Sequence, residues 1–274
     1  MKIGVDIGGT KIIAGYRGLD GQLVTSEKVL TPAGQAEGIA AIVSLVTTLA
    51  DGKPISVLSI SAPGPMDFAA GLLLSPANLS WGDVAIVSEL QQAFPETTIM
   101  LENDAKAAAL AEYLEGAGQG AKALLYLTIS TGIGTALIID GHIFHGAHDT
   151  EGGRMLLRDS AGHLATLEAT VSGSAIKQRF GKLAYEITDP ATWQTIGSDL
   201  ALGLINMINL ISPDRVVLGG GVMVHYDKLE QPMHQALEAL VHPYPLPPIL
   251  PAIHIETAAV LGAVLLAEGA GHSA

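Results

Sequence analysis

The stretch DIGGTK, at residues 6–11, joins two apolar segments at the start of the chain. In the segment before it, Lys2–Ile7, apolar residues alternate with polar or small ones, as in a strand with one buried face. The segment after it, Lys11–Tyr16, predicts a second strand. Paired glycines allow a tight hairpin in which backbone N–H groups approach a ligand closely, and such donors suit phosphate oxygens.

The turn itself fits neither of two common phosphate motifs. A P-loop requires GxxxxGK[ST] between a strand and a helix, and a dinucleotide fingerprint requires GxGxxG at the start of a helix. In this stretch Asp6 could hold a metal-bound water, and Thr10 or Lys11 could reach a terminal phosphate. An ordinary glycine hairpin is the alternative interpretation.

A similar pattern opens the second half of the chain. Strands are predicted at Ala123–Ser130 and Thr135–Ile139, with a turn between them at Thr131–Gly134. A hairpin turn then follows at Asp140–Gly141, as one does earlier at Asp20–Gly21. We interpret this as a degenerate internal repeat, which predicts two similar lobes with a cleft between them. Two facing hairpins can clamp a polyphosphate, whereas one cannot.

A third glycine site, Gly219–Gly221, follows the apolar segment Val216–Leu218. These glycines predict either a flat platform for a nucleobase or ribose, or the simple end of a strand. The rest of the chain indicates an α/β fold with mixed sheets. Further strands are expected at Leu23–Val29, Ile55–Ile60 and Thr98–Leu101, and helices at Ala36–Leu49, Val87–Ala93, Asp104–Glu115, within Trp193–Ile211, and at Ala258–Ala267.

Composition excludes several classes of protein. The 274 residues are 49% hydrophobic and 15% charged, which excludes a disordered chain. With 14 Lys+Arg against 27 Asp+Glu, the net charge is −13, so no nucleic-acid partner is expected. The absence of cysteine excludes disulfides, a thiolate nucleophile and Cys-based zinc sites. No apolar stretch is long enough for a membrane span and no secretory signal is visible, so a cytoplasmic protein is expected.

Taken in order along the chain, the motifs resemble those of the actin-like sugar kinase and Hsp70 ATPase superfamily. More closely, the chain resembles the ROK family of bacterial sugar kinases and repressors. The matching segments are Asp6–Lys11, Ala62–Pro65, Asn78–Trp81, Leu101–Ala105, Ser130–Gly134, Leu167–Ala169, Ser172–Gly173 and Gly219–Gly221.

The resemblance implies a two-lobed actin-like (ribonuclease H-like) ATPase fold with an interlobe cleft. The N-terminal lobe would comprise residues 1–116, joined by the C-terminal helix at 257–274, and the C-terminal lobe residues 117–256. It also implies a homodimer and glucokinase-like, ATP- and Mg²⁺-dependent phosphorylation of a hexose or N-acetylhexosamine hydroxyl. Because the first strand starts at Lys2, no DNA-binding extension is expected and the repressor branch is disfavoured.

By the same resemblance, Asp104 is the general base that accepts the proton of the sugar hydroxyl, although an Asp at this position could simply cap the following helix. Mg²⁺ would arrive with ATP, possibly held at Asp6. The sugar would be bound by Gly64, Asn78, Asn103, Asp104, Glu151 and Glu168, with Arg154 less certain. ATP would be bound by Asp6, Gly8, Gly9, Thr10, Lys11, Thr131, Gly132, Gly134, Gly219, Gly220 and Gly221.

The match departs from the family at one place. Zinc-binding members carry Glu-x-Gly-His followed by a cysteine cluster, whereas this chain has Glu151-Gly152-Gly153-Arg154 and a shorter loop without cysteine. We therefore predict no zinc, and interpret the lone His163 as a surface residue. Arg154 is expected either to pair with Glu151 or Glu168 and hold the loop, or to mark a changed substrate.

Trp81 either faces the sugar or packs in the core, Met207 and Met223 are core residues, and Asp199 lies on a solvated helix face. A sugar or nucleotide sensor without activity and an actin-like ATPase activator remain as alternatives to the kinase. The sequence does not identify the sugar.

Overall fold

The computed structural model describes residues 1–76, 78–146, 149–159, 161–240 and 243–269. The chain forms two compact units, which are described separately. Unit 1 comprises Met1–Ala111 and Thr257–Ala274, and unit 2 comprises Glu112–Glu256. No helix in the described ranges combines the length and the apolar character needed to span a lipid bilayer.

Unit 1 is built on a six-stranded sheet with the spatial order β3-β2-β1-β5-β8, and β4 pairs with β2. The strands β1, β5 and β8 run parallel, with Asp6 opposite Ser61 and Ser61 opposite Glu102. Because parallel strands end at the same edge of a sheet, this edge carries the first glycine turn and the residues after β5 and β8. The strands are β1 (Lys2–Ile7), β2 (Lys11–Arg17), β3 (Leu23–Thr25), β4 (Val29–Leu30), β5 (Val57–Ala62) and β8 (Thr98–Asn103); β6 (Met66–Asp67) and β7 (Leu72–Leu73) form a separate hairpin.

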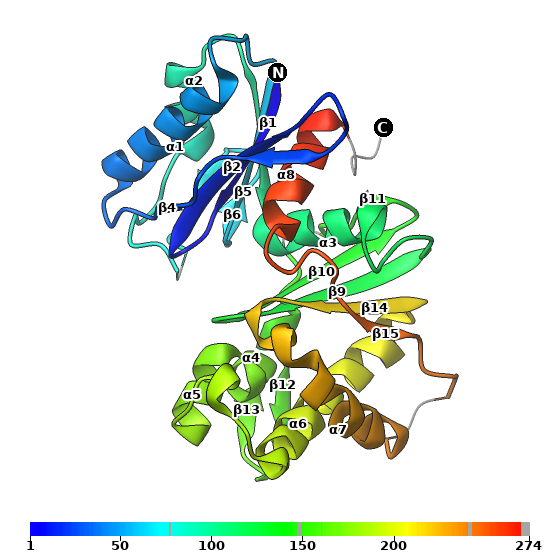
Figure 1. The fold of residues 1–274 in the computed structure, drawn as a ribbon. Coiled ribbons are helices and arrows are strands. Elements are labelled where there is room, and N and C mark those ends of the chain that lie inside the picture. Colours follow the sequence, from blue (N-terminus) through cyan, green and yellow to red (C-terminus); the bar gives the residue numbers. More distant parts are fainter. Residues whose placement is uncertain (77, 147–148, 160, 241–242, 270–274) are drawn as a thin grey trace. The chain divides into compact units, whose positions relative to one another are not determined.

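Helices cover both faces of this sheet. In Figure 1, α1 (Gln35–Ala50) and α2 (Ile86–Ala93) lie on one face, and α8 (Ala258–Glu268) lies on the other. Helix α8 is apolar all round because it packs between the sheet and α3 (Asp104–Glu115). Two glycines permit this: a Cβ at Gly4 would lie 2.4 Å from the Val264 nitrogen, and one at Gly262 would clash with the Ala107 carbonyl.

Unit 2 repeats this plan. Its five-stranded sheet has the order β11-β10-β9-β14-β15, in which an antiparallel hairpin is again followed by two parallel strands. The internal repeat predicted from the two strand–turn–strand segments is therefore confirmed at the level of topology. The strands are β9 (Ala123–Ile129), β10 (Ile133–Ile139), β11 (His142–Ile143), β14 (Arg215–Gly219) and β15 (Ile249–Pro251), with a separate hairpin of β12 (Leu156–Arg158) and β13 (Leu164–Thr166).

The long helix α6 (Pro190–Ile211) packs against α7 (Tyr226–Glu238), as Figure 1 shows, and apolar side chains of both helices lie in the core of unit 2. Asp189 is the N-cap of α6: its carboxylate accepts the N–H groups of Ala191 and Thr192, and Pro190 fits the first helical position. Two short helices, α4 (Leu167–Val171) and α5 (Gly173–Phe180), follow the β12–β13 hairpin. One-turn 3₁₀ helices occur at Gly152–Arg154, Ala184–Glu186 and Gly221–His225.

The structure corrects two expectations. The strand predicted at Leu23–Val29 is divided into β3 and β4. The regular pairing ends at Ser26: its N–H still donates to the Ala14 carbonyl at 2.8 Å, but the Ala14 N–H donates to the Ser26 hydroxyl instead of the Ser26 carbonyl. The prediction for Asp199 was wrong: its side chain is completely buried and pairs with Arg179 at 2.8 Å. Met207 and Met223 are buried as predicted.

Candidate functional site

The first glycine turn, residues 8–10, is called turn 1. The Gly8 N–H donates to the Lys11 carbonyl at 2.9 Å, and the Thr31 hydroxyl donates to the Gly8 carbonyl at 2.6 Å. In the described part of the chain, the N–H groups of Gly9 and Thr10 donate to no protein acceptor. Turn 1 therefore presents two consecutive backbone donors, as a phosphate would require.

Gly9 also brings turn 1 against a second predicted site residue. A Cβ at Gly9 would lie 2.5 Å from the carbonyl oxygen of Asn78. Asn78 itself is exposed, and Lys11, at the start of β2, is exposed as well. The close approach of two backbones, rather than a special φ angle, is what requires glycine here.

Two carboxylates interact beside turn 1. Asp6 lies at the end of β1 and accepts the Ser61 hydroxyl at 3.3 Å. Burial, together with the charge of Asp104, raises the pKa of Asp6 to about 7. The structure thus brings the residue predicted for magnesium close to the residue predicted as general base.

The start of α3 shows which residue caps the helix. The side-chain oxygen of Asn103 accepts the N–H groups of Ala105 and Lys106 at 3.0 and 3.3 Å, which is the bonding of an N-cap residue. Asp104 occupies the first helical position, where its Oδ1 also accepts the Ala105 N–H at 2.7 Å. Capping is therefore assigned to Asn103, and it does not explain the choice of Asp at position 104.

Gly64 and Trp81 are two further predicted residues of unit 1, and only the environment of Trp81 decides between its interpretations. Gly64 follows β5 and precedes a cis peptide bond to Pro65, at the same edge of the sheet as Asp6 and Asn103. Trp81 packs in the core: its side chain is buried and its indole N–H donates to the Pro32 carbonyl at 2.8 Å. Of the two interpretations of Trp81, packing is the correct one.

The second glycine turn, residues 130–132, is called turn 2 and lies between β9 and β10. The Gly173 N–H donates to the Ser130 carbonyl at 2.6 Å, so the start of α5 holds one end of the turn. The Ile133 N–H donates to the Glu168 carboxylate at 2.8 Å. Within the described ranges, the N–H groups of Thr131 and Gly132 have no protein acceptor, as in turn 1.

The three consecutive glycines after β14 have different environments. Gly219 lies against Tyr126: a Cβ added at Gly219 would be 2.3 Å from the Tyr126 hydroxyl. Gly220 has a φ of +88° and lies against the backbone of Ile129. Internal packing therefore requires both. A Cβ at Gly221 would meet nothing within 4 Å, so Gly221 alone is open to a ligand.

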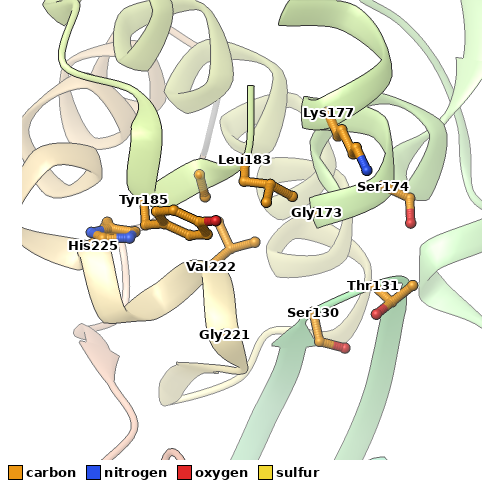
Figure 2. A pocket seen from close by; sticks show the side chains of 11 residues that line it. Ser130, Thr131, Gly173, Ser174, Lys177, Leu183, Tyr185, Gly221, Val222 and His225 are labelled. Atoms are coloured by element: carbon orange, nitrogen blue, oxygen red, sulfur yellow. The ribbon is translucent and has the colours of Figure 1, made fainter. Parts of the chain in front are cut away.

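Turn 2 and Gly221 border a cavity of about 440 Å³ within unit 2. Figure 2 shows the Tyr185 ring beside Val222 and His225, while Lys177 and Ser174 come from α5. The volume of this cavity suits a nucleoside. Its walls are mostly apolar with a few polar groups, as is typical of sites that bind small molecules. The lining residues are Ser130, Thr131, Gly173, Ser174, Lys177, Leu183, Ala184, Tyr185, Gly221, Val222 and His225.

Sequence analysis missed most of this cavity. Ser174, Lys177, Tyr185 and His225 come from α5, the turn after it and the turn after β14, and no spacing along the chain connects them. The segment Ser172–Gly173 was noted only as a match to the family. Its Ser172 hydroxyl caps α5 by accepting the Ala175 N–H at 3.1 Å, which orients the helix that carries Lys177.

The segment that departs from the family pattern contains an exposed ion pair. The Arg154 guanidinium lies 3.4 Å from the Glu151 carboxylate, and the two side chains are 75% and 45% exposed. Glu151 is one of the two partners expected for Arg154. Such an exposed pair contributes little to stability. The Gly152 N–H donates to the Thr135 hydroxyl at 2.9 Å, and this bond ties the segment to β10.

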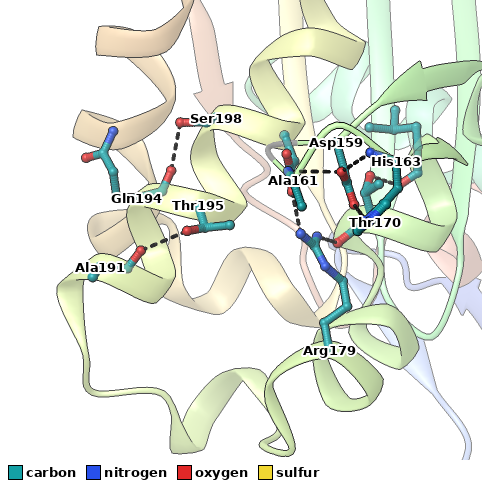
Figure 3. A network of polar contacts seen from close by, with 11 residues as sticks. Asp159, Ala161, His163, Thr170, Arg179, Ala191, Gln194, Thr195 and Ser198 are labelled. Atoms are coloured by element: carbon teal, nitrogen blue, oxygen red, sulfur yellow. Dashed lines mark hydrogen bonds and ion pairs between the residues drawn. The ribbon is translucent and has the colours of Figure 1, made fainter.

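The β12–β13 hairpin is closed by a carboxylate. Asp159 accepts the N–H groups of Ala161 and His163, and the His163 N–H holds the pKa of Asp159 below its usual range (Figure 3). The His163 ring is 79% exposed, as predicted for a surface residue. Across the described residues, no three His, Asp or Glu side chains are grouped so that they could hold a metal ion.

A buried ion pair stabilises the helices behind the hairpin. The Arg179 guanidinium pairs with Asp199 of α6 at 2.8 Å. It also donates to the Thr170 carbonyl in α4 (Figure 3). Arg179 thus connects three helices: α4, α5 and α6. Because Glu168 lies in α4, this ion pair also stabilises the helix that holds its carboxylate against turn 2.

Comparison with known proteins agrees with this architecture. A fructokinase of Pediococcus pentosaceus is 28% identical over 287 residues, covering 97% of each chain. The crystal structure of a ROK hexokinase from Thermus thermophilus is 29% identical, with a TM-score of 0.79 and coverage of 96% of each chain. A ROK family glucokinase from Streptomyces griseus, in complex with glucose and AMPPNP, is 26% identical, with a TM-score of 0.82 and coverage of 98% of this chain and 99% of the other.

These likenesses confirm the α/β, actin-like fold that the family resemblance implies. The family model described as "ROK family" matches residues 2–270, nearly the whole chain. This chain therefore belongs to the ROK family.

Proposed function

We propose that the protein is an ATP-dependent sugar kinase in which Asp104 is the general base. The observation that carries the proposal is the arrangement at the carboxyl edge of the unit 1 sheet, where Asp104 interacts with Asp6 beside turn 1 while Asn103 caps the helix. A carboxylate beside phosphate-type donors suits a hydroxyl nucleophile, because its proton must be accepted as phosphorus is attacked.

In the reaction, the sugar hydroxyl oxygen forms a bond to the γ-phosphorus and the bond from that phosphorus to the bridging oxygen of ADP breaks. The hydroxyl proton passes to the Asp104 carboxylate. Gly64, Asn78 and the Asn103 amide would bind neighbouring sugar hydroxyls, since the Asn103 oxygen is engaged by the helix start. Glu151 and Glu168 of unit 2 would contribute further sugar contacts, with Arg154 orienting Glu151.

The donor nucleotide would use both glycine turns and the cavity of unit 2. The paired N–H groups of turn 1 and of turn 2 are donors for phosphate oxygens, and Lys11 and Lys177 supply positive charge near each turn. The cavity has room for the nucleoside beside Tyr185 and Val222. The AMPPNP bound to the Streptomyces griseus relative supports ATP as donor.

Magnesium, brought in with ATP, would neutralise charge on the phosphates during transfer. Asp6 is the residue that fits this ion. Its carboxylate is crowded by burial and by Asp104, as its raised pKa shows, and a nearby cation would relieve that repulsion.

The acceptor is proposed at the level of hexoses and N-acetylhexosamines. A fructokinase and a glucokinase both resemble the chain, at 28% and 26% identity, and relatives so distant do not select one sugar. The exposed Glu151–Arg154 pair is the feature of this chain that would shape the choice.

One assay tests the proposal. Purified protein with ATP and Mg²⁺ is offered a panel of hexoses and N-acetylhexosamines, and ADP release is measured by a coupled reaction, with Asp104→Asn as the control. We expect release that depends on one or a few sugars and is lost in the variant. Sugar binding without ADP release would instead indicate a sensor, and sugar-independent release would indicate an ATPase that acts on another protein.

A further inference from the structure

Glu168 contacts turn 2 directly. Its Oε2 accepts the Ile133 N–H at 2.8 Å, and the Cβ that Gly132 lacks would lie 2.5 Å from the same oxygen. Gly132 does not have a positive φ, so backbone conformation alone does not require glycine at this position. The space beside Gly132 is filled by a carboxylate, and a side chain there would displace it.

The position of this carboxylate is fixed by the start of α4. The Thr166 hydroxyl caps the helix by accepting the Ala169 N–H at 3.1 Å, and the Leu167 N–H donates to the Met155 carbonyl at 2.9 Å. Leu167 is fully buried and packs against Gly203 of α6, where a Cβ would lie 2.6 Å from it. Glu168 therefore projects from an anchored backbone, although its own side chain is exposed.

We propose that Glu168 is a positioning residue for the nucleotide: by binding the Ile133 N–H it holds turn 2 in the shape that presents the Thr131 and Gly132 donors. A hydrogen bond to a carboxylate is about twice as strong as one between neutral groups, so one such bond can fix a short turn. This inference rests on the proposed function, because it takes the phosphates as the ligand of turn 2. It adds a role on the nucleotide side for a residue predicted only as a sugar ligand.

The first experiment measures the Kd of Mg²⁺·AMPPNP by calorimetry without sugar. We expect Glu168→Ala to weaken binding about ten-fold and Glu168→Gln to remain within about three-fold of wild type, because the amide oxygen can still accept the Ile133 N–H. The matched control is Glu238→Ala, which removes an exposed carboxylate of α7; its Kd should not change. Unchanged binding in Glu168→Ala, or equal loss in Glu168→Ala and Glu238→Ala, would overturn the proposal.

The second experiment is a double-mutant cycle with Gly132→Ala. Its methyl group would push the Glu168 carboxylate away, so the substitution should weaken nucleotide binding about five-fold in wild type and have little further effect in Glu168→Ala. If Gly132→Ala has the same effect in both backgrounds, the methyl group obstructs the phosphate itself and Glu168 is not the intermediary.

A third measurement does not depend on the proposed function. Hydrogen exchange of the nucleotide-free protein should be at least ten-fold faster in the peptide covering residues 130–134 in Glu168→Ala than in Glu168→Gln, with melting temperatures confirming that both fold. Faster exchange in a protein that binds no nucleotide would overturn the proposed function and the nucleotide as the ligand of turn 2, and would show only that Glu168 orders the turn. Equal exchange in the two variants would overturn the positioning role alone.

Discussion

Turn 1 and turn 2 occupy equivalent places in two sheets with the same strand order, yet different kinds of contact stabilise them. In turn 1, Gly9 lies against the backbone of Asn78, and an adjacent hydroxyl, that of Thr31, holds the Gly8 carbonyl. In turn 2, Gly132 lies against the end of the flexible Glu168 side chain. Turn 1 is therefore fixed by a backbone contact and a hydroxyl, whereas turn 2 is held at one end by the Gly173 N–H and at the other by a carboxylate.

The surroundings of the two turns also differ. Turn 1 adjoins two interacting carboxylates, Asp6 and Asp104, whereas turn 2 adjoins a cavity with largely apolar walls and Lys177. Both copies of the strand–turn–strand unit thus present phosphate-type donors, but in different surroundings. Under the proposed function, unit 1 would carry the acid–base groups and unit 2 the nucleoside site.

The largest expected effect tests whether the chemistry belongs to unit 1. Asp104→Asn should lower kcat at least 10³-fold, about 4 kcal/mol in transition-state energy, because the amide cannot accept the hydroxyl proton. The Kd of Mg²⁺·AMPPNP should stay within about three-fold, which calorimetry would measure. The matched control, Glu96→Gln on the exposed surface of unit 1, should leave kcat unchanged. Residual activity above a tenth of wild type would place the general base elsewhere.

The next effect concerns the support of turn 2. Asp199→Ala leaves the Arg179 guanidinium in a largely buried site without its partner, and breaking such a pair typically costs about 3 kcal/mol. Urea unfolding would measure the loss, with Asp227→Ala on α7 as a control. If Asp199→Ala costs less than about 1 kcal/mol, the ion pair is not what holds α4, α5 and α6 together.

Asp199 also shows what the sequence could and could not predict. Strand alternation and helical stripes located most strands of the two large sheets and the helices α1, α2, α3, α6 and α8. They did not locate α4, α5, α7, β15 or the β6–β7 and β12–β13 hairpins. The glycine patterns located the two turns whose N–H groups are free of protein acceptors within the described residues. An Asp within a helix carries no local sign of burial, because its partner Arg179 comes from another helix. The cavity residues Tyr185 and His225 were missed for the same reason: tertiary packing brings them together, and no periodicity records it.

The glycines illustrate a second limit. Gly219–Gly221 were predicted either to form a platform for a nucleobase or ribose or simply to end a strand, but Gly219 and Gly220 are required by contacts with Tyr126 and Ile129. Gly132 accommodates the Glu168 carboxylate. A sequence shows where a Cβ is missing, and only the structure shows what occupies its place.

The two turns can be compared directly by placing the same methyl group in each. Gly9→Ala should destabilise the protein by about 2 kcal/mol, because the Cβ meets a backbone carbonyl that cannot move alone. Gly132→Ala should cost less than about 1 kcal/mol, since a side-chain end can rotate away. Thermal unfolding of both variants would measure the difference. Equal losses would show that the surroundings of turn 2 are as rigidly packed as those of turn 1.

The last contrast is a dependence on pH near turn 1. The pKa of Asp6 is about 7 in the folded protein and near 3.8 when unfolded, so the unfolded state ionises first as pH rises. Stability linked to Asp6 is therefore fully present below pH 4 and is lost as pH rises through 7. Asp6→Asn removes this loss, so it should stabilise the protein at pH 8 and have almost no effect at pH 4.

Asp159 in unit 2 provides the opposite case. The His163 N–H lowers the pKa of Asp159 in the folded protein. The contribution of Asp159 to the free energy of unfolding is therefore present above its unfolded pKa and disappears as pH falls. Asp159→Asn should therefore destabilise the protein at pH 8 and have less effect at pH 4, the reverse of Asp6→Asn. Urea unfolding of both variants at the two pH values measures the contrast. If Asp6→Asn also destabilises at pH 8, Asp6 is held ionised by favourable contacts, and turn 1 does not have the strained acid pair that distinguishes it from turn 2.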